Sequence, residues 1–371
     1  MAILCMGRPF YNYYAKDIGV MESRKKSVVI LTPGFPRDEE DTTCMPFLQD
    51  YLTAFLSVRP DVKIRVIAFQ YPAKHGHYKW NGIDVYSTAG GTQKNLSRFF
   101  LWRKVWKELK RIEMEEGIDV IHSFWLTECT LIAQKFAKKS GTKHVAYAIG
   151  QEVLKTNRYL PLLNFNKMSV VAMSEYLAEK FKSSTGHEVN AIIASGVDMS
   201  KVNTDMMDKT IDIIGVGALI PLKNYALFVD LIAELKKENS TIKACIIGKG
   251  EQESMLKEKA KQLGLIKNIE FVGEIAHQEV FMYLNKSKVF LHTSAYEGQS
   301  TVMMEALATG LSVVCFDVGR LDVKGKVIVC KDKNNMVAQL KKLLMLKLDY
   351  SPAMHRTSED MVNDFIKVYG I

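Results

Sequence analysis

Two glutamates, eight positions apart, are the residues of this chain whose spacing most clearly suggests chemistry. They are Glu297 and Glu305, in the stretch SAYEGQSTVMMEALATG that covers residues 294–310. Glu297 precedes a helix that the pattern predicts near 300–309, and Glu305 falls in the second turn of that helix. Helical side chains lean toward the start of their helix, so Glu305 should reach back toward the loop that carries Glu297. A solvated helix face is the alternative interpretation.

The chemistry that such a pair supports follows from the groups themselves. A carboxylate accepts hydrogen bonds at both oxygens, so Glu305 can hold two vicinal hydroxyls, such as those of a ribose. Glu297 can hold the hydroxyls of a second ring, and the free N–H groups at a helix start suit a diphosphate. The stretch therefore predicts a site for a nucleotide sugar.

Glycines and one lysine extend this site. Gly217 and Gly248 each follow an expected strand, where glycine lets the backbone approach a ligand, although a simple strand-to-helix turn also explains them. Lys223 lies near the start of the next helix, where the dipole favours an anion; a lone surface lysine is the alternative. The glycines do not match G-x-G-x-x-G, so a dinucleotide fingerprint is absent.

The first half of the chain offers weaker candidates. Gly34, Arg37 and Asp38 follow its first strand, at the start of an acidic run that shapes an acceptor pocket or is simply a solvated loop. His122 and His292 end two strands, and we interpret both as structural. No D-x-D occurs and no zinc-type spacing is present, so neither a metal nor another cofactor is expected.

The elements that must position these residues alternate between strand and helix from Val28 onward, which predicts doubly wound parallel sheets. The alternation stops near 199–211 and then restarts, so we place a linker there. The predicted organisation is an N-terminal extension (1–27), a first Rossmann-like domain (28–205), a second one that binds the nucleotide sugar (206–350), and a final helix (351–371). Thr357 and Asp360 fit a capping box for that helix.

Composition limits the class of protein. The chain has 371 residues, a formal net charge of +9 and six cysteines without a C-x-x-C pair. No apolar run is long enough to predict a membrane span, so a cytoplasmic enzyme with reduced thiols is expected. The basic, aromatic segment 97–113 repeats Phe99, Trp102, Trp106, Leu109 and Ile112 at helical spacing. We predict that it packs on a sheet; peripheral docking on the inner membrane face is the alternative.

The phrase EGQSTVMMEALATGLSVV resembles the E-x7-E signature of retaining glycosyltransferases of family 4, which have the GT-B fold. GVGALIPLKNYALFVDLIAEL resembles the glycine loop and lysine of that family, and the likeness covers roughly residues 28–330. The resemblance implies two Rossmann-like domains that face a central cleft, with the final helix crossing back to the first. It implies that Glu305 binds the ribose, that Glu297 contacts the donor sugar near the reacting carbon, and that Lys223 binds the phosphates. It also implies a backbone anion cradle, formed by Gly298, Gln299, Ser300 and Thr301.

Two positions depart from the family pattern. Ala218 stands where the family often has an arginine, and Ile149 stands where it often has a histidine, while Gly150 and Glu152 remain as candidate cleft residues. The expected function is transfer of a sugar from a UDP- or GDP-sugar to a hydroxyl of a glycan or lipid-linked acceptor, with retention of configuration. A weakened nucleotide-sugar-binding protein and a nucleotide-sugar epimerase are the alternatives. No recognition motif for nucleic acid is present.

Overall fold

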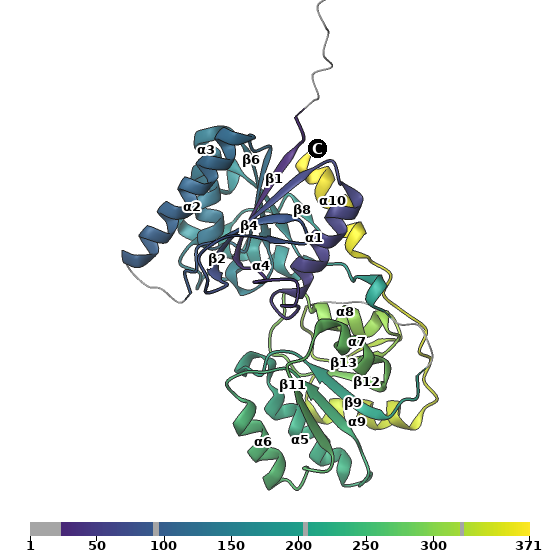
Figure 1. The fold of residues 1–371 in the computed structure, drawn as a ribbon. Coiled ribbons are helices and arrows are strands. Elements are labelled where there is room, and N and C mark those ends of the chain that lie inside the picture. Colours follow the sequence, from purple (N-terminus) through teal and green to yellow (C-terminus); the bar gives the residue numbers. More distant parts are fainter. Residues whose placement is uncertain (1–23, 92–95, 203–206, 320–322) are drawn as a thin grey trace, which may run out of the picture.

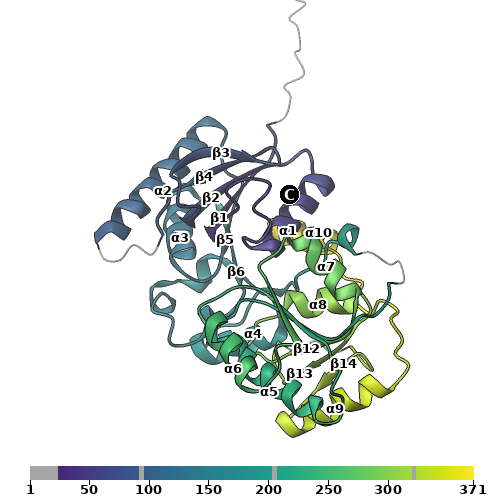
Figure 2. The ribbon, with the colours of Figure 1, turned by 60° about the horizontal axis from the view of Figure 1, so that its bottom comes forward.

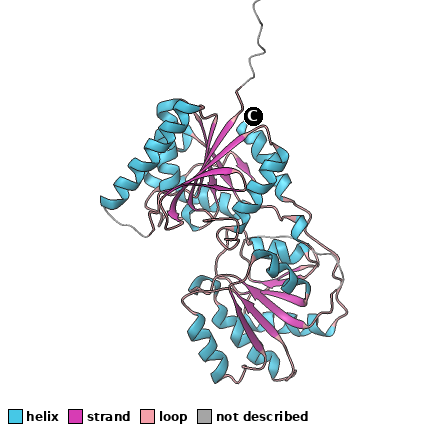
Figure 3. Cartoon of the chain, viewed as in Figure 1, coloured by secondary structure: helices cyan, strands magenta, loops and turns pink. Residues whose placement is uncertain are grey.

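The computed structural model describes residues 24–91, 96–202, 207–319 and 323–371. Most of the expected N-terminal extension and the middle of the expected linker lie outside these ranges. The described residues form two sheets that are stacked end to end along the molecule, each covered by helices on both faces (Figures 1 and 3). This is the GT-B architecture that the sequence predicts.

The first sheet has eight strands in the order β3-β4-β2-β1-β5-β6-β7-β8. Its strands are β1 (Ser27–Gly34), β2 (Lys63–Tyr71), β3 (Gly76–Trp80), β4 (Ile83–Ser87), β5 (Val120–Phe124), β6 (Lys143–Ala148), β7 (Ser169–Ala172) and β8 (Ala191–Ile192). Its helices are α1 (Pro46–Val58), α2 (Leu96–Glu115), α3 (Glu128–Ser140) and α4 (Glu175–Thr185). The continuous apolar runs of β1 and β5 are buried on both faces, as parallel strands require.

The second sheet has six strands in the order β11-β10-β9-β12-β13-β14. Its strands are β9 (Ile211–Val216), β10 (Ala244–Ile247), β11 (Ile269–Gly273), β12 (Ser287–His292), β13 (Ser312–Cys315) and β14 (Val327–Val329). Its helices are α5 (Tyr225–Lys236), α6 (Glu253–Gln262), α7 (His277–Asn285), α8 (Thr301–Ala308) and α9 (Lys333–Met345). All its described pairings are parallel, so the loops after β9, β10 and β12 meet at one edge.

The edge of the first sheet departs from the expected all-parallel pattern. β3 pairs with β4 in antiparallel register, and Asn81 and Gly82 form the two-residue turn between them. Both turn residues have positive φ, 44° and 81°, which is the backbone that an Asn-Gly hairpin requires. Asn-Gly is a sequence signal for such a hairpin, whereas the apolar pattern gave no signal for α7.

Helix α2 packs on the first sheet, as expected, and of the predicted apolar residues Trp102, Trp106, Leu109 and Ile112 lie in this contact while Phe99 does not. Leu101 and Val105 are buried against the sheet together with Leu109 and Ile112. Phe99 is 61% exposed, because a position two residues before Leu101 falls on the other side of the helix. In the part of the chain that the structure describes, no helix combines the length and the apolar character needed to cross a bilayer.

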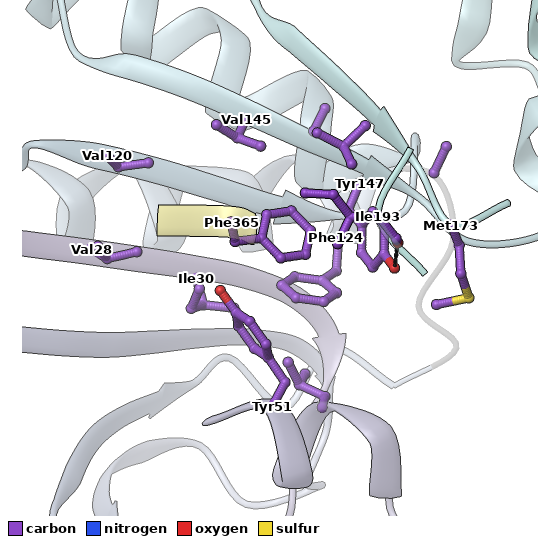
Figure 4. Packing of buried hydrophobic residues seen from close by; sticks show 14 of the residues in the cluster. Val28, Ile30, Tyr51, Val120, Phe124, Val145, Tyr147, Met173, Ile193 and Phe365 are labelled. Carbon is purple, nitrogen blue, oxygen red and sulfur yellow. Dashed lines mark hydrogen bonds between the residues drawn. The ribbon is translucent and has the colours of Figure 1, made fainter. Parts of the chain in front are cut away.

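The C-terminal helix α10 (Ser358–Tyr369) returns to the first sheet and packs beside α1 (Figure 1). Phe365 enters the core between Tyr147 and Tyr51 (Figure 4), and the Tyr369 hydroxyl lies 2.7 Å from that of Tyr51. The expected capping box is confirmed: the Asp360 N–H donates to the Thr357 hydroxyl oxygen at 3.1 Å. The segment after α9 is thereby anchored to the first sheet.

Candidate functional site

A cavity of about 430 Å³ lies where the two halves of the molecule meet. The second sheet contributes the loops after β9, β10 and β12 and the start of α8, and the first half contributes the segment just before and at the start of α1. Predicted site residues that line the cavity are Gly217, Lys223, Gly248, Glu297, Gln299, Ser300, Thr301 and Glu305. Residues of the first half that line it are Thr42, Thr43, Pro46 and Phe47. The sequence carried no signal for these four.

Gly217 and Gly248 bring two loops into backbone contact at the cavity wall. A Cβ atom at Gly248 would lie 1.9 Å from the Gly217 carbonyl oxygen, so no other residue fits there without moving the backbone. Both residues also have positive φ, 151° and 136°, a conformation that favours glycine. The two glycines therefore close the floor of the cavity at the carboxyl ends of β9 and β10.

Glu297 forms the charged centre of the cavity. One of its oxygens lies 2.6 Å from Lys223 Nζ and 3.1 Å from His292 Nε2. Burial alone would raise the pKa of Glu297, but the hydrogen bond from His292 and the charge of Lys223 outweigh burial and lower it to about 2. The ion pair of Glu297 and Lys223 is therefore fully charged at neutral pH, and a diphosphate would compete with Glu297 for the lysine.

Glu305 is held by a residue that sequence reasoning missed. His277, the first residue of α7, places its Nε2 atom 2.9 Å from Glu305 Oε1, and the two side chains are only 8% and 7% exposed. Burial opposes protonation of His277, but the hydrogen bond and charge of Glu305 outweigh it and raise the pKa of the imidazole. Glu305 is thus a buried, oriented carboxylate at the cavity wall and does not belong to a solvated face.

The loop from Gly298 to Thr301 is pinned to the first half of the molecule. The Ser174 hydroxyl donates to the Gly298 carbonyl at 2.6 Å, and the Ser195 N–H donates to Gln299 Oε1 at 2.8 Å. A Cβ atom at Gly298 would lie 2.1 Å from the Ile149 carbonyl oxygen. Gly298 thus makes a close contact between the two halves and is not among the residues that line the cavity, whereas Ser300 and Thr301 are.

The helix start in this loop is open to a ligand. Ser300 is the N-cap of α8, but its side chain makes no capping hydrogen bond. Its hydroxyl lies instead 3.2 Å from His292 Nε2. The N–H groups of the first turn are therefore left without a side-chain cap beside Lys223, an arrangement that suits phosphate oxygens.

The candidate site residues of the first half do not line the cavity. Glu152 accepts hydrogen bonds from the Ile149 N–H at 2.7 Å and the Gly150 N–H at 2.9 Å, so it shapes its own loop. Burial raises the pKa of Glu152, although those hydrogen bonds oppose the shift. Arg37 and Asp38 pair with each other at the surface, 3.3 Å apart. The described residues that line the cavity therefore do not include Gly34, Arg37, Asp38, Gly150 or Glu152.

The two departures from the family pattern have different surroundings. Ala218 lines the cavity and adds no charge to it, but Lys249, in the loop after β10, lines the same cavity. Ile149 packs its side chain against the core of the first half, while its carbonyl contacts Gly298. Among the described residues, no group of three or more histidine, cysteine or acidic side chains is arranged to hold a metal ion.

Two parallel-sheet domains, a helix that crosses back and a cavity between them define the GT-B class of protein. Residues 200–359, which include the second sheet and its helices, match the family model described as glycosyl transferases group 1.

Two relatives of this chain carry the names of sugar transferases. The phosphatidylinositol N-acetylglucosaminyltransferase gpi3 subunit of Schizosaccharomyces pombe is 23% identical over 274 residues, which cover 69% of this chain and 59% of the relative. The chain therefore spans under two thirds of the length of that subunit. The N-acetylgalactosamine-N,N'-diacetylbacillosaminyl-diphospho-undecaprenol 4-alpha-N-acetylgalactosaminyltransferase of Campylobacter jejuni is 27% identical over 164 residues, or 41% of this chain and 44% of the relative.

A solved structure extends the likeness over nearly the whole chain. HepE from Anabaena, in complex with UDP and glucose, aligns with a TM-score of 0.71 and 16% sequence identity. The alignment covers 94% of this chain and 99% of HepE. At this identity the likeness establishes the shared fold.

Proposed function

We propose that the protein transfers a sugar from a nucleotide-sugar donor to a hydroxyl of a glycan or lipid-linked acceptor, with retention of the anomeric configuration. The observation that carries the proposal is the arrangement of Glu305, Lys223 and the uncapped start of α8 around one cavity. They supply a carboxylate for ribose hydroxyls, a cation for phosphate and backbone N–H groups for an anion. A nucleoside diphosphate needs these three groups side by side.

The reaction follows from the same groups. The bond between the anomeric carbon and the diphosphate oxygen breaks, and the electron pair leaves on the diphosphate. Lys223 and the helix N–H groups stabilise that charge, which is often the largest catalytic contribution. We assign Glu297 to the sugar, where its negative charge would stabilise the positive charge that develops on the ring. The oxygen of the acceptor hydroxyl attacks from the face that the diphosphate leaves and forms the new bond to the anomeric carbon, while its proton passes to the departing diphosphate oxygen.

The choice of donor and acceptor rests on the relatives. HepE was solved with UDP, which favours a UDP-sugar over a GDP-sugar for this chain. The yeast and Campylobacter relatives are named for acceptors that carry a lipid, which favours an acceptor of that kind here. A protein that binds the donor but has lost catalysis is the second candidate, because Ile149 and Ala218 replace two residues that the family often uses.

A two-stage experiment tests the proposal. A thermal-shift screen of UDP, GDP and ADP should show stabilisation by one diphosphate, because a ligand that binds only the native state raises the melting temperature. The corresponding nucleotide sugars are then incubated with the protein, and nucleotide release and the anomeric proton of the product are followed by NMR. Binding without any release favours the second candidate. No stabilisation by any nucleotide contradicts both.

A further inference from the structure

The ribose carboxylate Glu305 is connected to the other half of the molecule by a chain of buried polar side chains. His277 Nε2 lies 2.9 Å from Glu305, and His277 Nδ1 lies 3.4 Å from Lys201 Nζ. Lys201 in turn pairs with Asp50 of α1. Asp50 is 5% exposed and Lys201 24%, so this is an interior connection.

The two ring nitrogens of His277 have complementary partners. The Lys201 ammonium has only hydrogen-bond donors, so it can satisfy Nδ1 only when that atom accepts. The ring proton of a neutral His277 then resides on Nε2, the atom that faces Glu305. Lys201 thereby selects the tautomer and ring orientation that give Glu305 a donor.

Lys201 bridges the two halves. The segment around it belongs to the second half by packing: Val197, Met199 and Val202 contact Phe281 of α7 and Met304 of α8. Its ammonium nevertheless reaches Asp50, which α1 of the first half carries. The backbone N–H of His277 also donates to the Thr42 hydroxyl oxygen, at 3.3 Å. Figure 2 shows α7 next to α1 at this junction.

We propose that His277 is a positioning residue for the nucleotide site, and that Asp50, acting through Lys201, makes nucleotide affinity depend on the placement of the first half of the molecule. The proposal rests on the proposed function, since it takes Glu305 as the ribose carboxylate. Separation of α1 from α7 would remove Asp50 and leave Lys201 with its second carboxylate partner, Asp198 at 3.6 Å, which would draw the ammonium away from His277. Donor binding and domain placement are then coupled without any contact between Asp50 and the donor.

The variants separate this coupling from simple packing. His277→Leu removes the donor to Glu305, whereas His277→Gln keeps an amide N–H near the position of Nε2 but removes the ring Nδ1 that faces Lys201. Asp50→Asn keeps the shape of α1 and removes the charge that holds Lys201. Asp212→Asn is the matched control, because Asp212 also pairs with a lysine, Lys288 at 2.7 Å, and is not among the described residues that line the cavity.

Isothermal titration with UDP, and with GDP if UDP does not bind, measures the effect in the full chain. We expect His277→Leu to weaken binding about 10-fold and Asp50→Asn roughly 3- to 10-fold, the size of a typical coupling between sites. In the His277→Gln background, Asp50→Asn should change the affinity less than twofold, and Asp212→Asn should match the parent throughout. If Asp50→Asn changes the affinity of the parent but not that of the His277→Gln variant, Asp50 acts through His277.

Several outcomes would overturn the inference. Equal losses from Asp50→Asn in the parent and in the His277→Gln background mean that Asp50 acts by another route. If the Asp50→Asn variant binds UDP as tightly as the parent, no coupling exists. The Lys201→Met variant checks this result at a second residue. A thermal melt confirms that each variant is folded. In both cases the proposed function stands if Glu305→Ala still weakens binding. A parent that binds neither UDP nor GDP contradicts the proposed function itself.

Discussion

Replacing the two glutamates of the cavity by glutamine should change nucleotide affinity in opposite directions. Glu297 forms an ion pair with Lys223 at 2.6 Å, so its negative charge occupies the cation that a diphosphate needs. Glu305 forms no such pair with Lys223; its partner is His277. Glu297→Gln should therefore release Lys223 for phosphate and tighten UDP binding, whereas Glu305→Gln should weaken it.

The structure limits the size of both effects. The difference between the ordinary pKa of Glu297, 4.5, and its value of about 2 corresponds to about 3 kcal/mol of stabilisation of its charged form. That is an upper limit for what the ion pair withholds from a ligand, and because the cavity is open to solvent we expect about 3- to 10-fold tighter binding. Removing the charged acceptor at Glu305 altogether, in Glu305→Ala, should cost about 1.5–3 kcal/mol, or roughly 10- to 150-fold in affinity.

Turnover should move differently from affinity. In the proposed function, Glu305 holds the nucleotide equally in the ground and transition states, so its loss should mainly raise the Michaelis constant for the donor. In the same proposal, Glu297 faces the developing charge on the sugar, and its loss should lower kcat by about 100-fold or more.

Isothermal titration with UDP and steady-state kinetics with one donor measure both quantities, and Asp212→Asn is the control. The reasoning fails if Glu297→Gln weakens UDP binding as much as Glu305→Ala does, because Glu297 is then a binding residue. If kcat of Glu297→Gln equals that of the parent, the catalytic assignment is wrong.

Four further outcomes are expected. The folded-state pKa of Glu297, about 2, lies below its ordinary value of 4.5, so its stabilising contribution is complete above pH 4.5 and is lost as the pH falls toward 2. In urea unfolding at pH 7 and pH 3, the free energy of unfolding of Glu297→Gln should therefore change less with pH than that of the parent. Lys249→Ala should weaken UDP binding by about 1 kcal/mol and lower its salt dependence in titrations. Tyr369→Phe removes a buried hydroxyl bonded to Tyr51 and should lower the free energy of unfolding by about 1–2 kcal/mol, with UDP affinity unchanged. Turnover should survive excess EDTA, since the chain has no D-x-D and Lys223 faces the phosphate site; loss of turnover that magnesium or manganese restores would contradict this.

The sequence allowed much of the fold to be predicted because strand and helix patterns are local. The apolar runs at 28–32 and 212–217 and the periodic stretch at 225–236 each carry their own signal. The β3–β4 hairpin carried one too, in Asn81 and Gly82. The buried face of α2 was harder to predict, because its aromatic residues surround more than one side of the helix and only packing on the sheet selects Leu101 over Phe99.

The residues that could be predicted to share the cavity are those close in sequence and those that follow parallel strands, as Lys223, Gly217 and Gly248 do. Glu297, Glu305 and the helix start lie within one short stretch, so their relation could be inferred from helix geometry. His277 is 28 positions from Glu305 and begins a helix that the pattern did not reveal. Ser174 and Ser195, which hold the loop at Gly298 and Gln299, are 124 and 104 positions away. Such contacts depend on how the two halves meet, and neither residue type nor spacing specifies that.

Of the two positions at which this chain departs from the family pattern, Ala218 is among the described residues that line the cavity and Ile149 is not. Ala218 withholds a cation near the phosphates, and Lys249 in the next loop places one on the same wall. Ile149 turns its side chain into the first core and keeps only a backbone contact with Gly298. The contact between Glu305 and His277 is intact, so we expect the proposed binding of a donor to survive both departures. Any loss of activity that Ala218 or Ile149 causes should therefore appear in the chemical step, where the charges of the departing diphosphate and of the sugar ring must be stabilised.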